Sequence, residues 1–483
     1  MQPNEHYHMV NRFLARRHGS RVGYILALAA LTVVPLSACD TNKLLSVSDP
    51  DVARPTVLAD ASALPALYAG AVGQFGLAFD GNNVGFDVEQ VTQSALLSDE
   101  LSNTETFPTR IEIDRRSQKL TNGSLEEAFL DINQARGLAE RAVKGVRSFA
   151  KTAVDSAGYP EELSLAGLTY VLFAENYCAA VPVSVLNDNG SFTYGAGLTT
   201  NQQLDSAIAR FNIALGVTGD PQTSTTVNLA KVAKGRALLD KGDFAGAAAA
   251  VSGVPTTFQY NYQHSSTTTL QNNGTWELTI DVGRFGVGDQ EGTNGLPYKT
   301  DGDIAGSVGD PRVVNHVRPT SKGHGFDGGP ELQFEQLKYP DRTSPSAIAD
   351  GVEARLIEAE AALNGGDAAG ALTILNALRS NTALLAVRGY DAAGLPPLTL
   401  QATTAAQVDQ LFKERAYWLY LTSHRLGDMR RLIRQYSRAA ESVFPTGPYF
   451  KGGNYGTDVN TPVPQPEQNN PNFKAGSCVQ SQP

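Results

Sequence analysis

The sequence predicts a mainly α-helical protein in which a scaffold of helical hairpins carries an inserted, loop-rich lobe. Three observations support this prediction. Apolar residues recur at helical spacing through much of 61–253 and 347–440. Two of these stretches share a helix–glycine–aspartate–helix pattern. Between them, residues 254–346 lack the helical periodicity and are rich in Gly, Thr, Asn and aromatic residues. The aromatic residues argue against disorder in this segment.

The N-terminus has the layout of an export signal. Basic residues at Arg12, Arg16, Arg17 and Arg21 precede the apolar run "VGYILALAALTVVPL". This run has about fifteen residues, whereas a membrane-spanning helix needs roughly 20. The run ends in "LSAC", which resembles the lipobox of bacterial lipoproteins. We therefore expect cleavage after residue 38 and lipidation of Cys39; the alternative is an ordinary signal peptide with an incidental cysteine.

The remaining chain divides into a tether and one large domain. Residues 39–60 are polar, contain Pro50 and Pro55, and suit a tether that holds a globule off a membrane. Residues 61–480 form the domain, with a tail rich in Pro, Gly and Asn at 441–480. The net charge of −10 argues against a nucleic-acid ligand, which requires clustered Lys and Arg.

Strong helical patterns follow one another along the scaffold. The stretch "ADASALPALYAGAVGQFGLAF" is predicted to be helical, and "SLEEAFLDINQARGLAERAVKGVRSFA" predicts a long amphipathic helix with Ser124 as its N-cap. A third helix, "ELSLAGLTYVLFAENYCA", should end before Val181-Pro182. Near the C-terminus, "AQVDQLFKERAYWLYLTSHRLGDMRRLIRQY" predicts a helix pair whose charges, from Glu414 to Arg431, we interpret as structural pairs supporting the helix surface or scaffold.

The two similar stretches each predict a helical hairpin. Residues 230–251 turn at Gly242-Asp243, and residues 353–375 turn at Gly366-Asp367. Small residues such as Ala248 and Ala371 would let the paired helices pack closely. The pattern resembles the tetratricopeptide unit, although two unrelated hairpins would also fit.

Several motifs together resemble the SusD/RagB family of outer-membrane nutrient-binding lipoproteins. In chain order they are the lipobox, "GLTYVLFAENYCAAVPVS", "GDPRV" at 309–313, "ARLIEAEAALN", "KERAYWLYLTSHRLGDMRRL" and the closing "TPVPQPEQNNPNF" with Pro464, Glu467 and Asn470. The matches extend over nearly the whole chain after Cys39. No single motif is specific to the family, but the ordered set is.

The resemblance implies a fold and a function. The fold would be a tetratricopeptide-like scaffold with a SusD-like lobe. The protein would be lipid-anchored in the cell outer membrane, bind a nutrient, most simply an oligosaccharide or else a peptide, and deliver it to a TonB-dependent, SusC-like transporter. Such a protein is not an enzyme and needs no cofactor.

The resemblance also points to ligand-binding residues in the lobe and in the loops after the first helix. Sugars are bound by aromatic faces and planar polar groups, so the candidates are aromatic or polar residues. Trp276 is the best single candidate. The alternative for each aromatic residue is that it is buried in the core of the lobe. The candidates are Trp276, Tyr260, Tyr262, Tyr298, Phe285, Asp80, Asn82, Asn103 and Phe107.

Other chemistries find little support in the sequence. Cys178 and Cys478 could form a disulfide in an oxidising compartment or remain two unpaired thiols. Neither has metal-ligand spacing, so we expect no metal site. No catalytic motif is present, although the carboxylate pair of a carbohydrate-active enzyme cannot be recognised from sequence. That enzyme and a helical-repeat scaffold that binds proteins are the alternative functions.

Overall fold

The computed structural model describes residues 60–82, 84–85, 88–152, 156–187, 189, 191–217, 223–304, 309–319, 325, 332–387, 394–474 and 476–483. The predicted leader, Cys39 and the tether before Asp60 lie outside the described residues.

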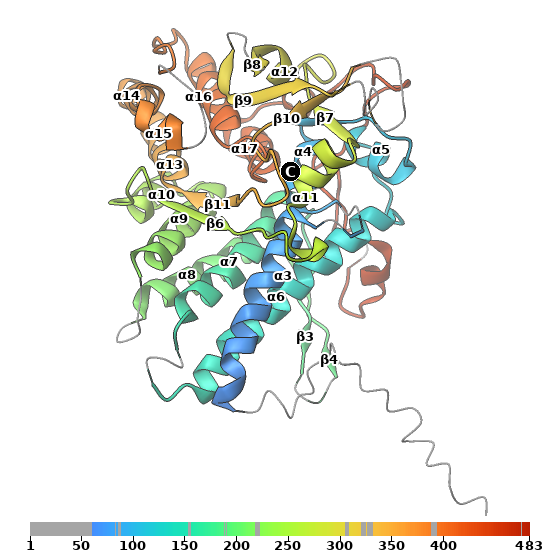
Figure 1. The fold of residues 1–483 in the computed structure, drawn as a ribbon, viewed down its shortest axis with the longest axis vertical. Coiled ribbons are helices and arrows are strands. Elements are labelled where there is room, and N and C mark those ends of the chain that lie inside the picture. The colour runs from blue at the N-terminus through green and yellow to red at the C-terminus, as the bar shows by residue number, and fades with distance from the viewer. Residues whose placement is uncertain are drawn as a thin grey trace, which may run out of the picture. The chain divides into compact units, whose positions relative to one another are not determined.

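The first half of the scaffold is a succession of long helices, each packed against the next (Figure 1). Helix α3 (Leu64–Asp80) packs on α6 (Gly123–Phe149), α6 on α7 (Tyr159–Asn176), α7 on α8 (Thr200–Gly216), and α8 on α9 (Ser224–Asp240). Among the described residues, Ala61–Asp80 has the length and apolar composition of a membrane span. However, Ala71 and Phe75 on this helix are completely or almost completely buried, so α3 serves as a core helix of the scaffold.

The N-cap of α6 differs from the prediction. Asn122, not Ser124, caps the helix, because its Oδ1 accepts a hydrogen bond from the Leu125 backbone N–H at 3.3 Å. The Ser124 hydroxyl instead donates to the Thr109 hydroxyl at 3.0 Å. Both residue types are good N-caps, so the sequence alone could not choose between positions two residues apart.

The two predicted helical hairpins are present, and they are neighbours. Helix α9 turns into α10 (Phe244–Val251), and α13 (Gly351–Asn364) turns into α14 (Ala368–Arg379). In each turn a glycine adopts a left-handed conformation, and the following aspartate caps the second helix: Asp243 accepts from the Gly246 N–H at 2.9 Å and Asp367 from the Gly370 N–H at 2.8 Å. Helix α10 packs on α13, so the two hairpins stack although they are far apart in sequence.

The C-terminal helix pair, α16 (Thr404–Trp418) and α17 (Arg425–Tyr436), closes the scaffold. Its charges are buried structural pairs that mostly reach across to other elements. Glu414 accepts from Arg312 at 2.7 Å and from Arg379 at 2.6 Å, and Arg312 belongs to the "GDPRV" motif. The prediction of structural pairing is thus confirmed, and of its two alternatives the scaffold, not the helix surface, is correct, since these charges join α16 to β9 and α14 inside the protein.

The lobe consists of short strands and helical turns. Its three small sheets pair β1 (Leu101–Asn103) with β7 (Phe285–Val287), β6 (Gln259–Tyr262) with β11 (Ser346–Asp350), and the central strand β9 (Asp310–Val317) with both β8 (Gly302–Ile304) and β10 (Phe334–Gln336). β6 enters the lobe and β11 leaves it, with Tyr260 opposite Ala349, so the two ends of the insertion meet at one ribbon. The π-helix η4 (Glu277–Asp281) follows α11 (Gly274–Trp276) within the lobe.

The remaining described elements are short. They are η2 (Ala61–Ala63), α4 (Gln90–Leu97), α5 (Pro108–Asp114), β2 (Val181–Pro182), β3 (Val185–Leu186), β4 (Phe192–Thr193), β5 (Gly197–Leu198), η3 (Thr269–Gln271), α12 (Tyr298–Asp301), α15 (Thr382–Val387), α18 (Ala440–Val443) and η6 (Gln465–Asn469).

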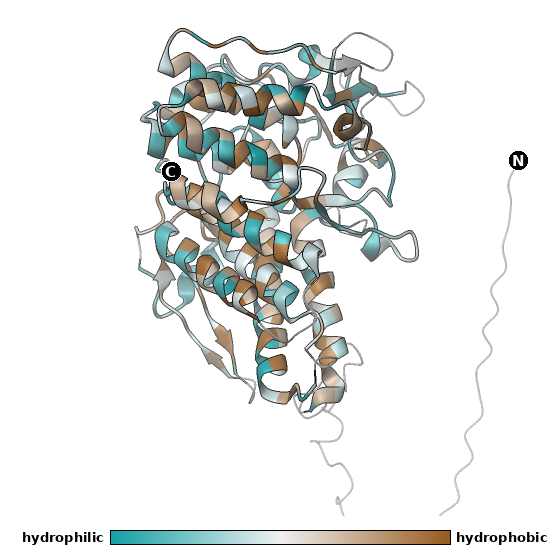
Figure 2. Ribbon diagram, turned by 90° about the vertical axis from the view of Figure 1, so that its left-hand side faces the viewer, coloured by the Kyte–Doolittle hydropathy of each residue, from teal (hydrophilic) through white to brown (hydrophobic). Residues whose placement is uncertain are grey.

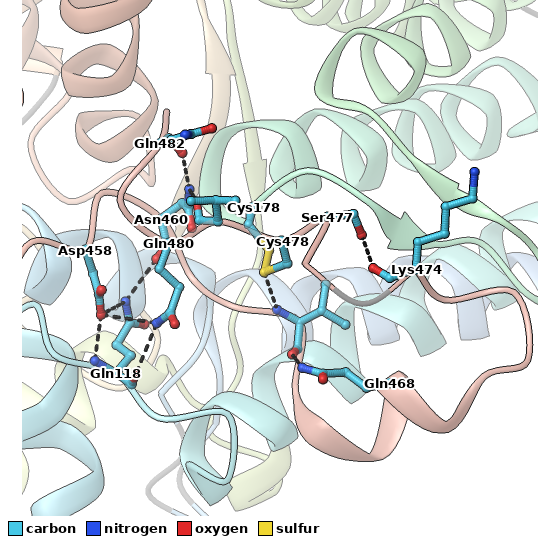
Figure 3. The surroundings of a disulfide bond; sticks show 12 residues. Gln118, Cys178, Asp458, Asn460, Gln468, Lys474, Ser477, Cys478, Gln480 and Gln482 are labelled. Carbon is cyan, nitrogen blue, oxygen red and sulfur yellow. Dashed lines mark hydrogen bonds between the residues drawn. A yellow bond between two sulfur atoms is a disulfide. The ribbon is translucent and has the colours of Figure 1, made fainter.

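The C-terminal tail returns to the end of α7 and is fixed there. The Cys178 backbone N–H donates to the Thr461 carbonyl at 2.9 Å, and the Thr461 N–H donates to the Asn176 carbonyl at 2.8 Å. Cys178 and Cys478 form a disulfide beside this contact (Figure 3). The pairing that the sequence left open is thus made in the structure.

Candidate functional site

A pocket of about 580 Å³ lies where the lobe meets the C-terminal tail; we call it the aromatic pocket. The β1–β7 pair forms one side, with Ser102 opposite Gly286 and Leu101 opposite Val287. Residues 448–451 and Tyr455 of the tail contribute another part of the lining. The lining residues are Ser102, Thr104, Gly286, Val287, Asp289, Gln290, Glu291, Gly292, Lys299, Leu332, Gln333, Phe334, Pro448, Tyr449, Phe450, Lys451 and Tyr455.

Aromatic rings of the tail are held firmly in this pocket. Tyr449 and Tyr455 meet edge to face with centroids 5.1 Å apart, and Tyr449 also contacts Phe450 at 4.8 Å. The Tyr449 hydroxyl donates to Asp114 at 2.7 Å, and the Tyr455 hydroxyl donates to Glu291 at 2.8 Å. The rings therefore have fixed positions before any ligand arrives.

Two exposed phenylalanines lie by the pocket. Phe450 is 49% exposed and Phe107 is 46% exposed. The Lys451 ammonium donates to the Glu105 carbonyl at 2.5 Å, which links the two segments that carry these rings. The guanidinium groups of Arg110 and Arg284 lie 5.5 and 5.1 Å from the Phe107 ring centroid. Because both arginines bind the buried Glu105 carboxylate, their guanidinium groups are held in place beside the Phe107 ring.

The polar groups of the pocket are also preorganised. Lys299 Nζ lies 3.2 Å from Asp289 Oδ2 and 5.1 Å from the centroid of the Phe334 ring. Asp289 also accepts hydrogen bonds from the backbone N–H of Thr300 at 3.0 Å and from its hydroxyl at 2.8 Å. The site thus combines exposed aromatic faces with fixed hydrogen-bonding groups, an arrangement suited to a polyhydroxylated ligand.

Two carboxyl groups, the buried Asp114 and the half-buried Glu291, are bonded to the pocket tyrosines. Burial raises the pKa of Asp114 to about 8, and the nearby charge of Glu291 contributes. Burial also raises the pKa of Glu291, against the hydrogen bond from Tyr455. Asp114 therefore favours its neutral form near neutral pH.

Among the predicted ligand residues, four lie near the aromatic pocket but only Phe107 is exposed. Phe285 and Asn103 are completely buried in the β1–β7 pair, where Asn103 Oδ1 accepts from the Glu105 N–H at 2.7 Å. Tyr298 is buried in a stack with Tyr417 at 5.3 Å and with Tyr420 at 5.2 Å. Phe285, Asn103 and Tyr298 are therefore core residues of this region, which corrects the expectation of direct ligand contact.

A second group of predicted residues meets elsewhere, at the end of α3. The α11 segment lies so close to Asp80 and Asn82 that a Cβ on Gly274 would be 2.4 Å from the Asp80 carbonyl oxygen. Trp276 is only 8% exposed, so the lone tryptophan is a core residue rather than a ligand platform. Tyr262 is half-buried against Gly76 and the His264 ring.

Asp80 takes part in a buried serine–histidine–aspartate contact. Ser346 Oγ donates to Asp80 Oδ2 at 2.9 Å and lies 2.9 Å from His264 Nε2, while Thr275 donates to Asp80 Oδ1 at 2.5 Å. Asp80, His264 and Ser346 are buried, and none of them lines the aromatic pocket. The arrangement joins α3 to the β6–β11 ribbon and offers no access to a substrate.

Tyr260 lines a different pocket, of about 740 Å³, between α3, α7 and α9. Its hydroxyl donates to Glu161 at 2.5 Å, and the Tyr68 hydroxyl donates to the same carboxylate at 2.8 Å. This second pocket is predominantly apolar and lies in the scaffold rather than the lobe, so we place the candidate site in the aromatic pocket.

None of the nine ligand residues predicted from the sequence lines the aromatic pocket. Phe334, Tyr449, Phe450 and Tyr455 were not among the candidates, although "GPYFKGGNYG" at 447–456 combines aromatic residues, Lys and Gly in the manner of a binding loop. In the part of the chain that the structure describes, no group of three or more His, Cys, Asp or Glu side chains could hold a metal ion.

Comparisons with known proteins address the fold. No family model matches this sequence, and no curated protein matches it. Solved structures do match: a SusD superfamily protein from Parabacteroides distasonis has a TM-score of 0.63 at 14% identity, over 86% of this chain and 98% of that chain.

Two further matches are described as SusD-like carbohydrate-binding proteins. The one from Bacteroides fragilis has a TM-score of 0.60 at 15% identity and covers 86% of this chain and 99% of its own. The one from Bacteroides vulgatus has a TM-score of 0.56 at 13% identity and covers 77% of this chain and 83% of its own. A helical-hairpin scaffold with an inserted lobe is thus a known architecture. The chain has the SusD fold, as its sequence predicted.

Proposed function

We propose that this chain is an outer-membrane surface lipoprotein that binds an oligosaccharide in the aromatic pocket and delivers it to a TonB-dependent, SusC-like transporter. The observation that supports this most directly is the exposed ring of Phe450, which lines the pocket beside its preorganised polar groups. The exposed ring of Phe107 lies on the neighbouring segment, which the Lys451–Glu105 hydrogen bond joins to the tail. A peptide is the second ligand class, since aromatic faces and fixed hydrogen-bonding groups would also hold an extended backbone.

The chemistry of the site favours a sugar. Pyranose rings present C–H groups on their faces and hydroxyls around their edges, so they bind best between aromatic faces and fixed donors and acceptors. Lys299, Asp289 and Thr104 supply such groups in the aromatic pocket. Two proteins of the same fold are described as carbohydrate-binding, which supports the same ligand class.

We further propose that the protein breaks no bond. Asp289 is engaged by Lys299 and Thr300, and the half-buried Glu291 is bonded to Tyr455, so the two pocket carboxyl groups already have partners in the protein. A glycosidase would need one of them free as a base and the other as an acid at a defined separation. Incubation with the bound oligosaccharide should therefore release no new reducing ends.

Binding can be tested by calorimetry with starch, xylan and pectin oligosaccharides. We expect Phe450→Ala and Phe107→Ala each to weaken binding roughly tenfold, because each removes a large apolar contact face. Leu400→Ala is a matched control, since it removes an exposed side chain of the scaffold. Unchanged affinity in both phenylalanine variants would contradict the placement of the site.

The partner can be tested by a mild-detergent pull-down from native outer membranes. We expect a barrel protein of the SusC class to co-purify in stoichiometric amount. Recovery of the lipoprotein alone would remove the main support for delivery to a transporter, while leaving the binding measurement intact.

A further inference from the structure

The β3–β4 hairpin exposes an unusual number of large apolar side chains. Val185 and Leu186 are each 52% exposed, Phe192 is 59% exposed and Tyr194 is 52% exposed. Leu186 lies opposite Phe192 across the two strands. Tyr194 follows Phe192 at the two-residue spacing of one strand face, so Leu186, Phe192 and Tyr194 define one apolar face of the hairpin.

The base of this hairpin is clamped. Asn472 donates to the Tyr194 carbonyl at 2.6 Å, and Asn470 contacts Ser184 Oγ and the Gly195 carbonyl at 3.4 Å. On the opposite side, Arg136 of α6 donates to the Ser184 carbonyl at 2.7 Å.

The clamp continues into the scaffold. The neighbouring β2–β5 pair and the Cys178–Cys478 disulfide join the hairpin's stem and the C-terminal tail to the end of α7. These contacts hold the hairpin in one conformation. Such preorganisation lowers the entropy cost of docking, whereas an exposed loop without a function would gain nothing from it.

The chemistry of the hairpin suits a lipid–water boundary. The sequence from Val183 to Gly195 contains one charged residue, Asp188 next to Asn187, and no Lys, Arg or Glu. The Asn187 side chain donates to Ser191 and Thr193 at 3.0 Å, so the turn is polar and the apolar residues lie in the stem. Aromatic residues with adjacent aliphatic ones are typical of membrane interfaces, and a hairpin lying flat would keep its polar turn among the headgroups.

The position of the hairpin fits the same occupant. In Figure 1, β3 and β4 lie toward the lower end of the coloured ribbon, as does the N-terminal end of α3, and Figure 2 shows strands coloured as hydrophobic at a similar height. The chain from Cys39 to Asp60 can span at most about 70 Å. If Cys39 carries a lipid, as the proposed function requires, this end of the domain is the end tethered to the bilayer.

We propose that the face formed by Leu186, Phe192 and Tyr194 lies in the outer surface of the lipid bilayer and is the domain's own contact with the membrane. This contact adds to the lipid chains of Cys39 and fixes the orientation of the scaffold. The inference rests on the lipid anchor of the proposed function and goes beyond it, because an anchor on a long tether would not by itself orient the domain.

The test uses the full-length lipidated protein with Leu186→Cys, labelled with an environment-sensitive fluorophore and reconstituted into vesicles of phosphatidylethanolamine and phosphatidylglycerol. Leu400→Cys, equally exposed at 52%, is the control site; it lies four residues before α16, which Figure 1 shows at the end of the ribbon opposite β3 and β4. We expect a blue shift and quenching by spin-labelled lipids at position 186 and neither at position 400. Circular dichroism and oligosaccharide calorimetry verify that both variants fold and bind.

Two results would overturn the inference. Water-like emission at position 186 in lipidated, vesicle-bound protein would show that the hairpin stays in solvent. A blue shift that requires a co-purified barrel protein would assign the hairpin to a protein partner. Failure of the lipid anchor itself would appear separately, as protein that does not float with the vesicles.

Discussion

Asp99 and Arg425 form a buried, two-pronged ion pair, with Nε to Oδ1 at 2.7 Å and Nη2 to Oδ2 at 2.8 Å. Asp99 follows α4, and Arg425 begins α17, more than three hundred residues later in the chain. Asp99 Oδ2 also accepts from the Leu296 backbone N–H at 2.8 Å. One carboxylate therefore fixes the position of the scaffold relative to the loop that leads to Lys299 in the aromatic pocket.

We expect Asp99→Asn to destabilise the protein by about 3–5 kcal/mol, because it leaves the Arg425 charge buried without its counter-charge. Urea unfolding measures the loss. Lys413→Ala, which breaks the half-exposed pair with Asp301, is the control and should cost about 1 kcal/mol or less. Equal losses in the two variants would show that burial does not determine the strength of these pairs.

Trp276→Ala should lower stability by about 3–5 kcal/mol, since the ring is buried against the end of α3. Oligosaccharide affinity, measured well below the melting temperature, should stay near that of the unchanged protein. A large loss of affinity with little loss of stability would restore Trp276 as a ligand platform.

Asp114 should make the protein less stable as pH rises. Burial and the charge of Glu291 raise the pKa of Asp114 to about 8 in the folded state, whereas its pKa in the unfolded chain is about 4. The contribution of Asp114 to the unfolding free energy is therefore complete below about pH 4 and is lost as the pH rises toward 8. Asp114→Asn should therefore flatten the decline of unfolding free energy between pH 5 and pH 8. Part of the decline in unfolding free energy should remain in this variant, because burial likewise raises the pKa of Glu100 to about 8. Parallel curves for variant and unchanged protein would contradict this assignment.

Paired Cys178→Ser and Cys478→Ser substitutions should lower the unfolding free energy by about 2–5 kcal/mol, because the disulfide closes a loop of 300 residues in the unfolded chain. Thermal melts with and without dithiothreitol measure the effect. The double variant should be insensitive to the reductant, whereas a matching response in both proteins would mean that the bond contributes nothing.

Cys39→Ala should release the protein from the membrane into the soluble periplasmic fraction. The reason is that a single hairpin contact holds a protein much more weakly than two or more acyl chains. Fractionation and immunoblotting measure the distribution, with Cys178→Ser as a control that keeps the predicted lipidation site. Unchanged attachment of Cys39→Ala would refute the lipoprotein assignment.

The helical part of the fold was predictable because its signals are local. Apolar periodicity, the Gly242-Asp243 and Gly366-Asp367 turns, and caps such as Asp243 all act within a few residues of the chain. The stacking of the two hairpins was not visible, since it depends on packing between α10 and α13. The buried role of Glu414 was missed for the same reason: its partners Arg312 and Arg379 come from distant segments.

The site was harder to predict because its residues converge from three regions of the chain. Phe107 was predicted from a loop that the family resemblance emphasised; its ring is exposed, but it does not line the aromatic pocket, so its ligand contact stays a prediction. Phe285 and Tyr298 have the same aromatic composition but face the core, and composition cannot distinguish the two sides of a short strand. Phe450 lies in a tail that has no periodicity to place it.

The cysteine bridge between residues 178 and 478 has a further consequence when a protease cuts the folded protein. It encloses the entire lobe, both helical hairpins and the C-terminal helix pair within one covalent ring. A protease that cuts a single peptide bond in this ring opens it without releasing a fragment. The cut protein would migrate as one species on a non-reducing gel and separate into two only after reduction.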